Sequence, residues 1–583
     1  MNPPEKRTPI VARVVLGLVS AVALVAVVWA FVALRWLHGL LSLYTAILLA
    51  PLLYCFCRRG AALWRDGFRR APKSEGWRLY GWTLLVFVSL TVLFYSLELW
   101  RGKRAYANLQ REVEAQGGSL ELKAVIPPPV PDDQNFCATP LLAAMMDYDS
   151  AVPPVMEERI RWRDPTALQR IEALRLPELK REETGHRRTS RAPSSSWLRA
   201  ERIDLAAWQR TFASHTNFPA SNPPRSPAED VVTALSKFDQ DFAELHAASQ
   251  RPAARWALHY QDGWFSVLGL EARFQHLRSM AYVLKLRAVA AVSAGRSEGA
   301  LQDVKLMWRL ADSMKEEPYF SAHYFRNELL LLSLQPVWEG LAARAWSDGQ
   351  LAEMQARLDP YDALASWQTA VRGETFQLMS LCRQVGDIFS WKTIRTRYRE
   401  LMPDAAIVGY VAAWLLYPSG WTYQDQVYLY RFCERELAAS RLAEHSVSSH
   451  RGLTRAEIPV DPFAMIFVLP KLREMFKDQS YFEFVRSSLQ QARLACALER
   501  HRLAQGDFPA TLDALVPRFL DKLPLAPDGN GLLLGYRRTA DGQFLLHPAG
   551  MTNVSERFEK KNARHTRYHR LGNTDGVWRY PTK

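Results

Sequence analysis

Three long apolar stretches occur within the first hundred residues. Residues 14–34, 36–57 and 79–97 contain no Asp, Glu, Lys or Arg, and aromatic side chains flank the third stretch. About 20 such residues cross the hydrocarbon core of a bilayer, roughly 30 Å, as a helix. The pattern therefore predicts a membrane anchor of three transmembrane helices in residues 1–100. A cleaved signal peptide is disfavoured, because its apolar core is only ~7 to 15 residues long.

The short flanks of these stretches predict their orientation. The connector 58–78 carries seven Lys or Arg residues, and three more precede residue 14. Positively charged flanks stay in the cytoplasm during insertion. Three crossings then place everything after Trp100 on the far side. We expect a multi-pass protein of the inner (cytoplasmic) membrane with a large periplasmic C-terminal domain.

After the third stretch the sequence is no longer continuously apolar and contains many charged residues. Residues 101–116 form a charged helical pattern that Gly117 and Gly118 end. The prolines in 126–131 favour an extended, polyproline-like spacer, because proline fixes φ and lacks an N–H donor. An apolar run at 141–146 begins the packed body. Residues 157–196 are too polar to bury much surface and predict an exposed helix and a mobile loop.

Helical periodicity dominates from Ser226 onward. Ser226 and Ser347 each open a capping box, and Gly295 separates an apolar helix, 268–294, from a partner helix, 297–314. Further helices are predicted at 326–345, 361–386, 423–444 and 481–505. The fold class is therefore mainly α. Successive helical hairpins stack in solenoid-like proteins, but no second copy of a ~34-residue period is visible, so a bundle of irregular hairpins remains an alternative.

The C-terminal tail combines a short helix with strands. The long helix 481–505 ends at Gly506, a short helix spans 511–515, and β-type runs at 532–538 and 543–547 flank an Asp-Gly turn at 541–542. Asp-Gly suits a tight hairpin turn. These features predict a small α+β module with a β-hairpin.

Two resemblances follow from these motifs. The segment 495–550, with Gly506, Phe508 and Pro509 followed by Pro517, Pro524 and Tyr536, resembles the C-terminal region of type II secretion major pseudopilins. In that family the loop after the sheet resembles a calcium site, but residues 551–570 are basic here, so no metal ligand is implied. The hairpin in 281–318 loosely resembles a tetratricopeptide unit.

The Pro-rich lead into residues 132–136, the helical centre and the tail together resemble uncharacterised membrane-anchored envelope proteins of planctomycete and verrucomicrobial type. This resemblance implies a Gram-negative-like envelope. The predicted organisation is a membrane anchor at 1–100, a charged helix and spacer at 101–140, a helical domain at 141–480 and a pseudopilin-like tail at 481–583.

The net charge and the cysteine content narrow the choice of partners and of disulfides only slightly. The formal net charge of +14 is spread among acidic residues, so we predict no nucleic-acid partner. We expect the lipid bilayer and other envelope proteins as partners. Four of the six cysteines, Cys137, Cys382, Cys433 and Cys496, lie in the predicted periplasmic domain. The sequence allows either one or two disulfides or buried free thiols there.

The chain contains no motif of a known catalytic site, and we predict no cofactor and no metal. His565 and His569 are four apart, but arginines surround them. Glu374 within an apolar helix is a candidate acid, to be weighed against an Arg-paired structural Glu. Other candidate ligands, each with a structural alternative, are the turn residues Asp132 and Asp133 and the aromatic residues Trp421 and Tyr423, which either stack on sugar or peptide or fill a core.

The pattern favours a membrane-anchored cell-envelope protein whose helical domain docks other proteins, related to secretion or envelope assembly. Whether the chain is an enzyme stays open, although the absence of a catalytic motif argues against it. The alternatives are a periplasmic hydrolase that uses buried carboxylates and a pilus-like structural subunit.

Overall fold

The computed structural model describes residues 73–148, 162–183, 186–190, 196–260, 268–388, 419–442, 479–524, 534–539, 542–547 and 577–580. The first two predicted spans lie outside these residues, as do His565 and His569. The chain divides into two compact units. We call residues 1–117, 382–428 and 455–470 the N-terminal unit, and residues 118–381, 429–454 and 471–583 the helical body.

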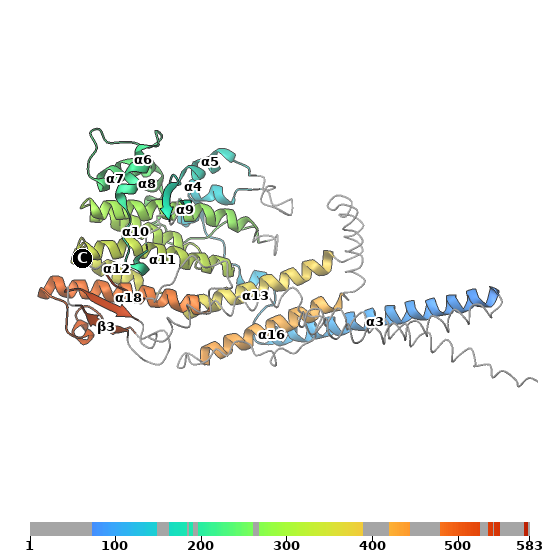
Figure 1. The fold of residues 1–583 in the computed structure, drawn as a ribbon. Helices are drawn as coiled ribbons and strands as arrows, with labels where there is room; N and C mark the ends of the chain where they lie inside the picture. The colour runs from blue at the N-terminus through green and yellow to red at the C-terminus, as the bar shows by residue number, and fades with distance from the viewer. Residues whose placement is uncertain are drawn as a thin grey trace, which may run out of the picture. The chain divides into compact units, whose positions relative to one another are not determined.

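The helical body is built on five stacked helices, which confirms the mainly α fold class. They are α9 (Leu268–Ser293), α10 (Ser297–Asp312), α11 (Phe320–Ala342), α12 (Asp348–Leu358) and α18 (Gln479–Gln505). Helices α9, α10 and α11 pack against one another, α18 packs on α11, and α12 packs on α18 (Figure 1). Their contact faces form one continuous apolar core.

Local signals set the helix ends as predicted. Gly295 and Gly506 adopt left-handed φ angles of 73° and 89° and follow the ends of α9 and α18. Glycine lacks the Cβ that disfavours this conformation. Both predicted capping boxes form, at Ser226 and at Ser347. The sequence therefore located these boundaries from local chemistry.

The region before α9 differs from the prediction in two places. The helix expected from Ser226 to about residue 249 is divided into α7 (Pro227–Leu235) and α8 (Asp239–Ala248) by a 3-10 turn at Ser236–Phe238. The polar region 157–196, expected to be helix and loop, holds α5 (Pro165–Ala173) and an antiparallel hairpin of β1 (Leu179–Glu183) and β2 (His186–Ser190). Helices α4 (Pro140–Ala143) and α6 (Leu205–Ala213) complete this part.

The C-terminal hairpin forms as predicted, with shorter strands. Strand β3 (Gly535–Arg538) pairs antiparallel with β4 (Phe544–His547), and Gly542 in the turn has φ 74°. Trp578 adds a bridge to Leu546 on β4 and is fully buried. A late segment of the chain is thereby held in the core of the body.

The four cysteines of the described residues are all buried and free: Cys137, Cys382, Cys433 and Cys496. Of the two possibilities left open by the sequence, the buried thiols are present. Burial raises the pKa of Cys382, Cys433 and Cys496 to about 12, because the thiolate is poorly solvated there. These thiols are therefore unreactive at neutral pH.

The N-terminal unit is dominated by α3 (Lys73–Ala115), a single helix of 43 residues. It joins the third predicted span and the predicted charged helix without a break, and Gly117 follows its end with φ 76°. The unit also contains the start of α16 (Gly420–Leu442) and the end of α13 (Ala363–Ile388). Within the described part of the chain, no helix is both long and apolar enough to span a bilayer.

Candidate functional site

Glu374, the predicted candidate acid, lies buried on α13 in the helical body. Its Oε2 accepts a hydrogen bond of 3.3 Å from the backbone N–H of Phe320, the first residue of α11. The first N–H groups of a helix have no partner within the helix, so a carboxylate there satisfies one and complements the helix dipole. Next to it, Gly373 allows α13 to approach the backbone of Pro318, where a Cβ would overlap. Glu374 thus fixes the start of α11.

Asp132 and Asp133 lie exposed on a 3-10 turn, away from the core. The neighbouring residue Asn135, considered from the sequence as a ligand together with these two acids, organises this region instead. Its Oδ1 accepts from the N–H groups of Cys137 and Arg255, at 3.1 and 2.8 Å, and its Nδ2 donates to the Arg255 carbonyl at 2.8 Å. Within the described residues, no cluster of His, Cys, Asp and Glu is arranged to hold a metal ion.

Trp421 and Tyr423 lie in the N-terminal unit, at the start of α16. The buried indole of Trp421 donates from Nε1 to Oε2 of Glu98 on α3 at 3.0 Å, and Gln424 donates to the same oxygen at 3.1 Å. The ring of Tyr423 meets Tyr106 edge to face, with 5.9 Å between centroids. Both aromatic residues join α16 to α3.

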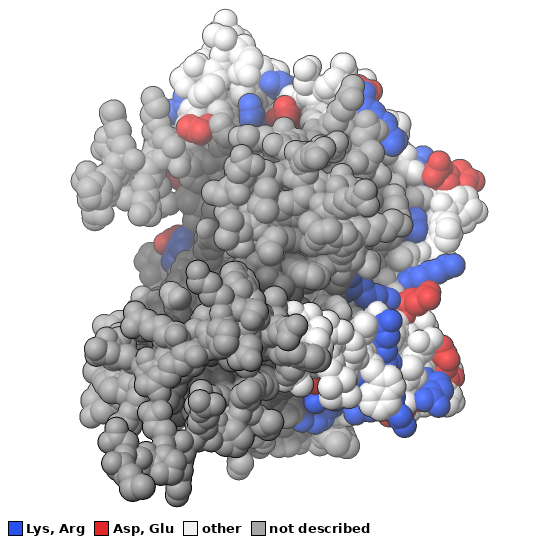
Figure 2. Space-filling view, turned by 90° about the vertical axis from the view of Figure 1, so that its right-hand side faces the viewer, with Lys and Arg blue, Asp and Glu red and all other residues white. Residues whose placement is uncertain are grey.

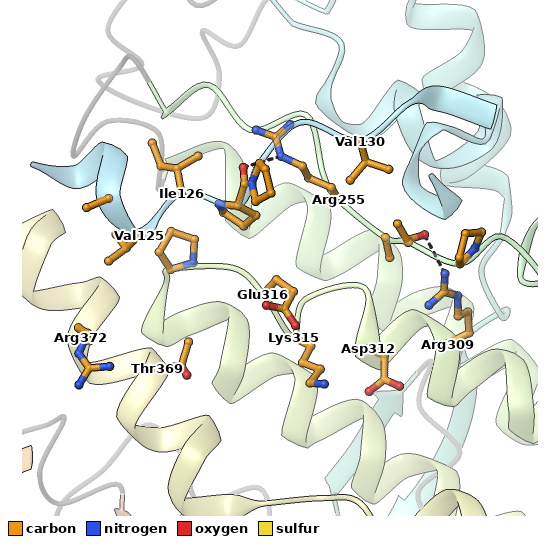
Figure 3. Close-up of a pocket in the computed structure, with 17 residues that line it drawn as sticks. Val125, Ile126, Val130, Arg255, Arg309, Asp312, Lys315, Glu316, Thr369 and Arg372 are labelled. Atoms are coloured by element: carbon orange, nitrogen blue, oxygen red, sulfur yellow. Dashed lines mark hydrogen bonds between the residues drawn. The ribbon is translucent and has the colours of Figure 1, made fainter. Parts of the chain in front are cut away.

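The helical body contains an open cavity of about 780 Å³ that the sequence did not predict (Figure 3). One wall is the Pro-rich segment 124–130, and the loop 252–255 adjoins it. The opposite side is formed by the C-terminal end of α10 with the residues that follow it to Pro318, and by Thr369 and Arg372 on α13. The predicted spacer is therefore packed against the body and shapes a cavity.

Two arginines in the cavity wall are held by backbone carbonyls. Arg255 donates from Nε to the Pro127 carbonyl at 3.0 Å, and Arg309 donates from Nη2 to the Ala253 carbonyl at 2.8 Å (Figure 3). Nη2 of Arg309 also donates to the Arg251 carbonyl at 2.6 Å. Burial lowers the pKa of Arg309, because its charge is partly removed from water. Among the described residues, neither guanidinium forms an ion pair with a carboxylate, although the charge of nearby Asp312 partly offsets the lowering of the Arg309 pKa.

Lys315 and Arg372 present their charges at the open side of the cavity. Lys315 is exposed and makes no side-chain hydrogen bond or ion pair with the described residues. Arg372 meets Glu434 only at 3.8 Å, and both side chains are about two-fifths exposed, at 40% and 43%. Such an exposed pair is weak. Both cations are therefore available to a ligand.

A second, smaller hollow of about 70 Å³ shares Asp312 and Lys315 with the cavity. Asp312 is paired with Arg326 at 3.1 Å and also with Arg357. The linings of the two hollows together carry six cations and two acids, an excess of four positive charges; the cations are Arg255, Arg309, Lys315, Arg326, Arg357 and Arg372, and the acids are Asp312 and Glu316.

A buried polar network holds the floor of the cavity in place. Arg273 and Glu317 form a two-pronged ion pair at 2.7 and 2.8 Å, both fully or almost fully buried. Two parallel N–H···O bonds make this geometry specific as well as strong. Glu317 stands between the lining residues Glu316 and Pro318, so its fixed position also fixes theirs.

Figure 2 shows basic and acidic side chains near one another on the described part of the face in view. The cations of the cavity come from three separate segments of the chain. No sequence motif marks it, since its lining residues become neighbours only through the packing of the helices.

Comparison with known proteins gives no match: no family model, no curated protein and no solved structure is detectably similar to this chain.

Proposed function

We propose that this chain is a membrane-anchored protein of the cell envelope whose helical body docks other proteins. The observation that carries the proposal is the uninterrupted helix α3, which joins a strongly apolar segment to a charged one. At about 1.5 Å per residue, its 43 residues extend about 65 Å, roughly twice the hydrocarbon thickness of a bilayer.

The apolar half of α3 exposes large side chains that water solvates poorly. Leu85, Leu93 and Trp100 are 54%, 63% and 57% exposed, and five further apolar residues between them are similarly uncovered. A contiguous apolar surface of this kind marks a membrane or protein contact. Lipid fits best, because residues 79–97 lack charge and Trp100 stands at their end, where aromatic residues prefer the interface.

The helical body supports the docking part of the proposal. Its stacked hairpins present an open cavity rather than a closed one, and solenoid-like stacks use such surfaces to bind proteins. The alternative hydrolase would require Glu374 to meet a second acid in a cleft. Instead, Glu374 accepts the Phe320 N–H, while Asp132 and Asp133 lie exposed on a turn.

Membrane extraction tests the anchor. The intact protein is expected to stay with membranes in alkaline carbonate, and a reporter fused after Lys583 is expected to be active in the periplasm. Val88→Arg places a charge near the centre of the third apolar stretch, at a cost of roughly 2.5–3.5 kcal/mol to insertion, and is expected to reduce correct placement of the reporter. Val88→Leu is the matched control. Release of the intact protein by carbonate contradicts the anchor.

Proximity labelling from the helical body tests docking. A labelling enzyme fused after Lys583 is expected to tag a small, reproducible set of envelope proteins. The same fusion carrying Lys315→Glu and Arg372→Glu is expected to lose part of that set. Tagging of cytoplasmic proteins alone contradicts the proposed placement of the body.

A further inference from the structure

We propose that the cavity beside Lys315 and Arg372 binds an extended, acidic peptide segment of a partner protein. This inference rests on the proposed docking function and specifies its site and the chemistry of its ligand. The site comprises the wall 124–130, the loop 252–255, the end of α10 and the exposed side of α13.

The positive charge of the cavity favours an acidic ligand. Of the two acids in the lining, Asp312 is already paired with Arg326 and Arg357. The other, Glu316, forms no ion pair with Lys315 or Arg372 among the described residues. Complementary charge both attracts a partner and selects against the wrong one. An approaching carboxylate gains Lys315 without breaking any ion pair, and it replaces only a 3.8 Å contact at Arg372.

The lining favours carboxylates over phosphate. A compact phosphate prefers backbone N–H groups at a helix N-terminus. This cavity instead has a wall containing Pro127 and Pro128, which have no N–H to donate, and its cations stand on separate segments of the chain. Carboxylates distributed along a chain suit separated cations better than one concentrated charge does.

The remaining lining fits a polypeptide backbone. Val125, Ile126 and the prolines offer apolar contact to side chains, while Glu316, which makes no side-chain hydrogen bond or ion pair with described residues, is an acceptor for a peptide N–H. The volume of about 780 Å³ lies within the ~300–1,000 Å³ that is typical of binding pockets. The open side lets a continuous chain enter and leave.

Fluorescence anisotropy with the purified full chain in detergent tests this site. The probe is a fluorescein-labelled decapeptide of alternating Glu and Ala, and the control peptide has Gln in place of Glu. The double variant Lys315→Glu and Arg372→Glu is expected to weaken probe binding at least about tenfold, and raised salt is expected to weaken it in the wild type. Lys315→Gln with Arg372→Gln is the milder variant, in case charge reversal impairs folding.

Arg296→Glu is the matched control, because Arg296 is exposed at the opposite end of α10 and outside the cavity. It is expected to bind the probe as the wild type does. Equal binding of the Gln peptide, equal binding by the double variant, or displacement of the probe by inorganic phosphate or by vesicles of phosphatidylglycerol overturns the inference. Because the assay uses purified protein, its failure leaves the carbonate and reporter results standing, and the two proposals fail separately.

Discussion

His323 shows how a single side chain is fixed by its surroundings. It lies fully buried on α11, with Nδ1 3.0 Å from the Ser366 hydroxyl and Nε2 3.0 Å from the Glu317 carbonyl. A carbonyl only accepts, so Nε2 carries the proton and Nδ1 accepts from Ser366. Burial, reinforced by the nearby charge of Arg326, lowers the pKa of His323 to about 3.

This shift predicts a loss of stability in acid. The unfolded chain binds a proton at His323 near pH 6.5, whereas the folded chain does so only near 3. The stabilisation is therefore complete above pH 6.5 and declines by about 1.4 kcal/mol per pH unit as the pH falls toward 3. Thermal unfolding of the wild type and of His323→Gln between pH 7 and 4 measures it, and the difference in stability is expected to shrink by about 3 kcal/mol.

His501→Gln is the control for this measurement, because His501 is partly exposed at the end of α18. It shows the effect of the same substitution outside the core. A difference for His323→Gln that stays constant with pH contradicts the buried neutral histidine.

At the scale of elements, α3 and α16 meet in a close crossing within the N-terminal unit. Gly102 and Gly420 face each other so closely that a Cβ on Gly420 would overlap the Glu98 carbonyl, and one on Gly102 would overlap the Gly420 carbonyl. Glu98 then accepts from Trp421 and Gln424, and Arg101 donates to Gln424 at 3.0 Å. Small residues thus allow the approach that the polar contacts require.

Gly420→Ala is expected to destabilise this crossing by roughly 1–3 kcal/mol, the usual cost of overpacking. Thermal melts and limited proteolysis of the detergent-solubilised chain measure the loss. Gly299→Ala is the matched control, since nothing lies within 4 Å of a Cβ there and alanine favours a helix. Identical melts for Gly420→Ala and the wild type would show that the two helices do not approach this closely.

At the scale of the whole chain, the C-terminal segment closes the core of the helical body. The ring of Trp578 packs against that of Trp197 at a tilt of 42°, with 5.1 Å between centroids, and its backbone exchanges two hydrogen bonds with Leu546. The indole of Trp338 on α11 donates to the carbonyl of Arg579 at 2.9 Å. Segments far apart in the sequence are therefore joined by residues close to the C-terminus.

Removal of residues 577–583 is expected to destabilise the body by about 3–5 kcal/mol or more, the range for deleting one large buried aromatic side chain. Thermal unfolding and limited proteolysis measure the loss. Removal of residues 581–583 alone retains Trp578 and Tyr580 and is expected to leave the melting temperature unchanged. Equal stability of the two truncated chains would show that Trp578 is not part of the core.

The sequence alone determined the features that depend on nearby residues. The mainly helical class, the ends of α9 and α18 at Gly295 and Gly506, both capping boxes and the C-terminal hairpin all follow from local backbone chemistry. The strand pair β1–β2 was not predicted, because its sequence is mostly charged and polar and lacks the alternation of apolar and polar residues typical of a strand. The division between α7 and α8 was not predicted either, because Ser236–Phe238 contains no helix-breaking residue.

Only the tertiary structure decided which distant residues meet. Glu98 and Trp421 are 323 positions apart, and Phe320 and Glu374 are 54 apart. The cavity joins four segments between residues 124 and 372, and no periodicity or motif relates them. Hydrogen bonds and charges act over a few ångströms, so their partners are set by the packing of the helices, whereas a sequence pattern records only what neighbours along the chain favour.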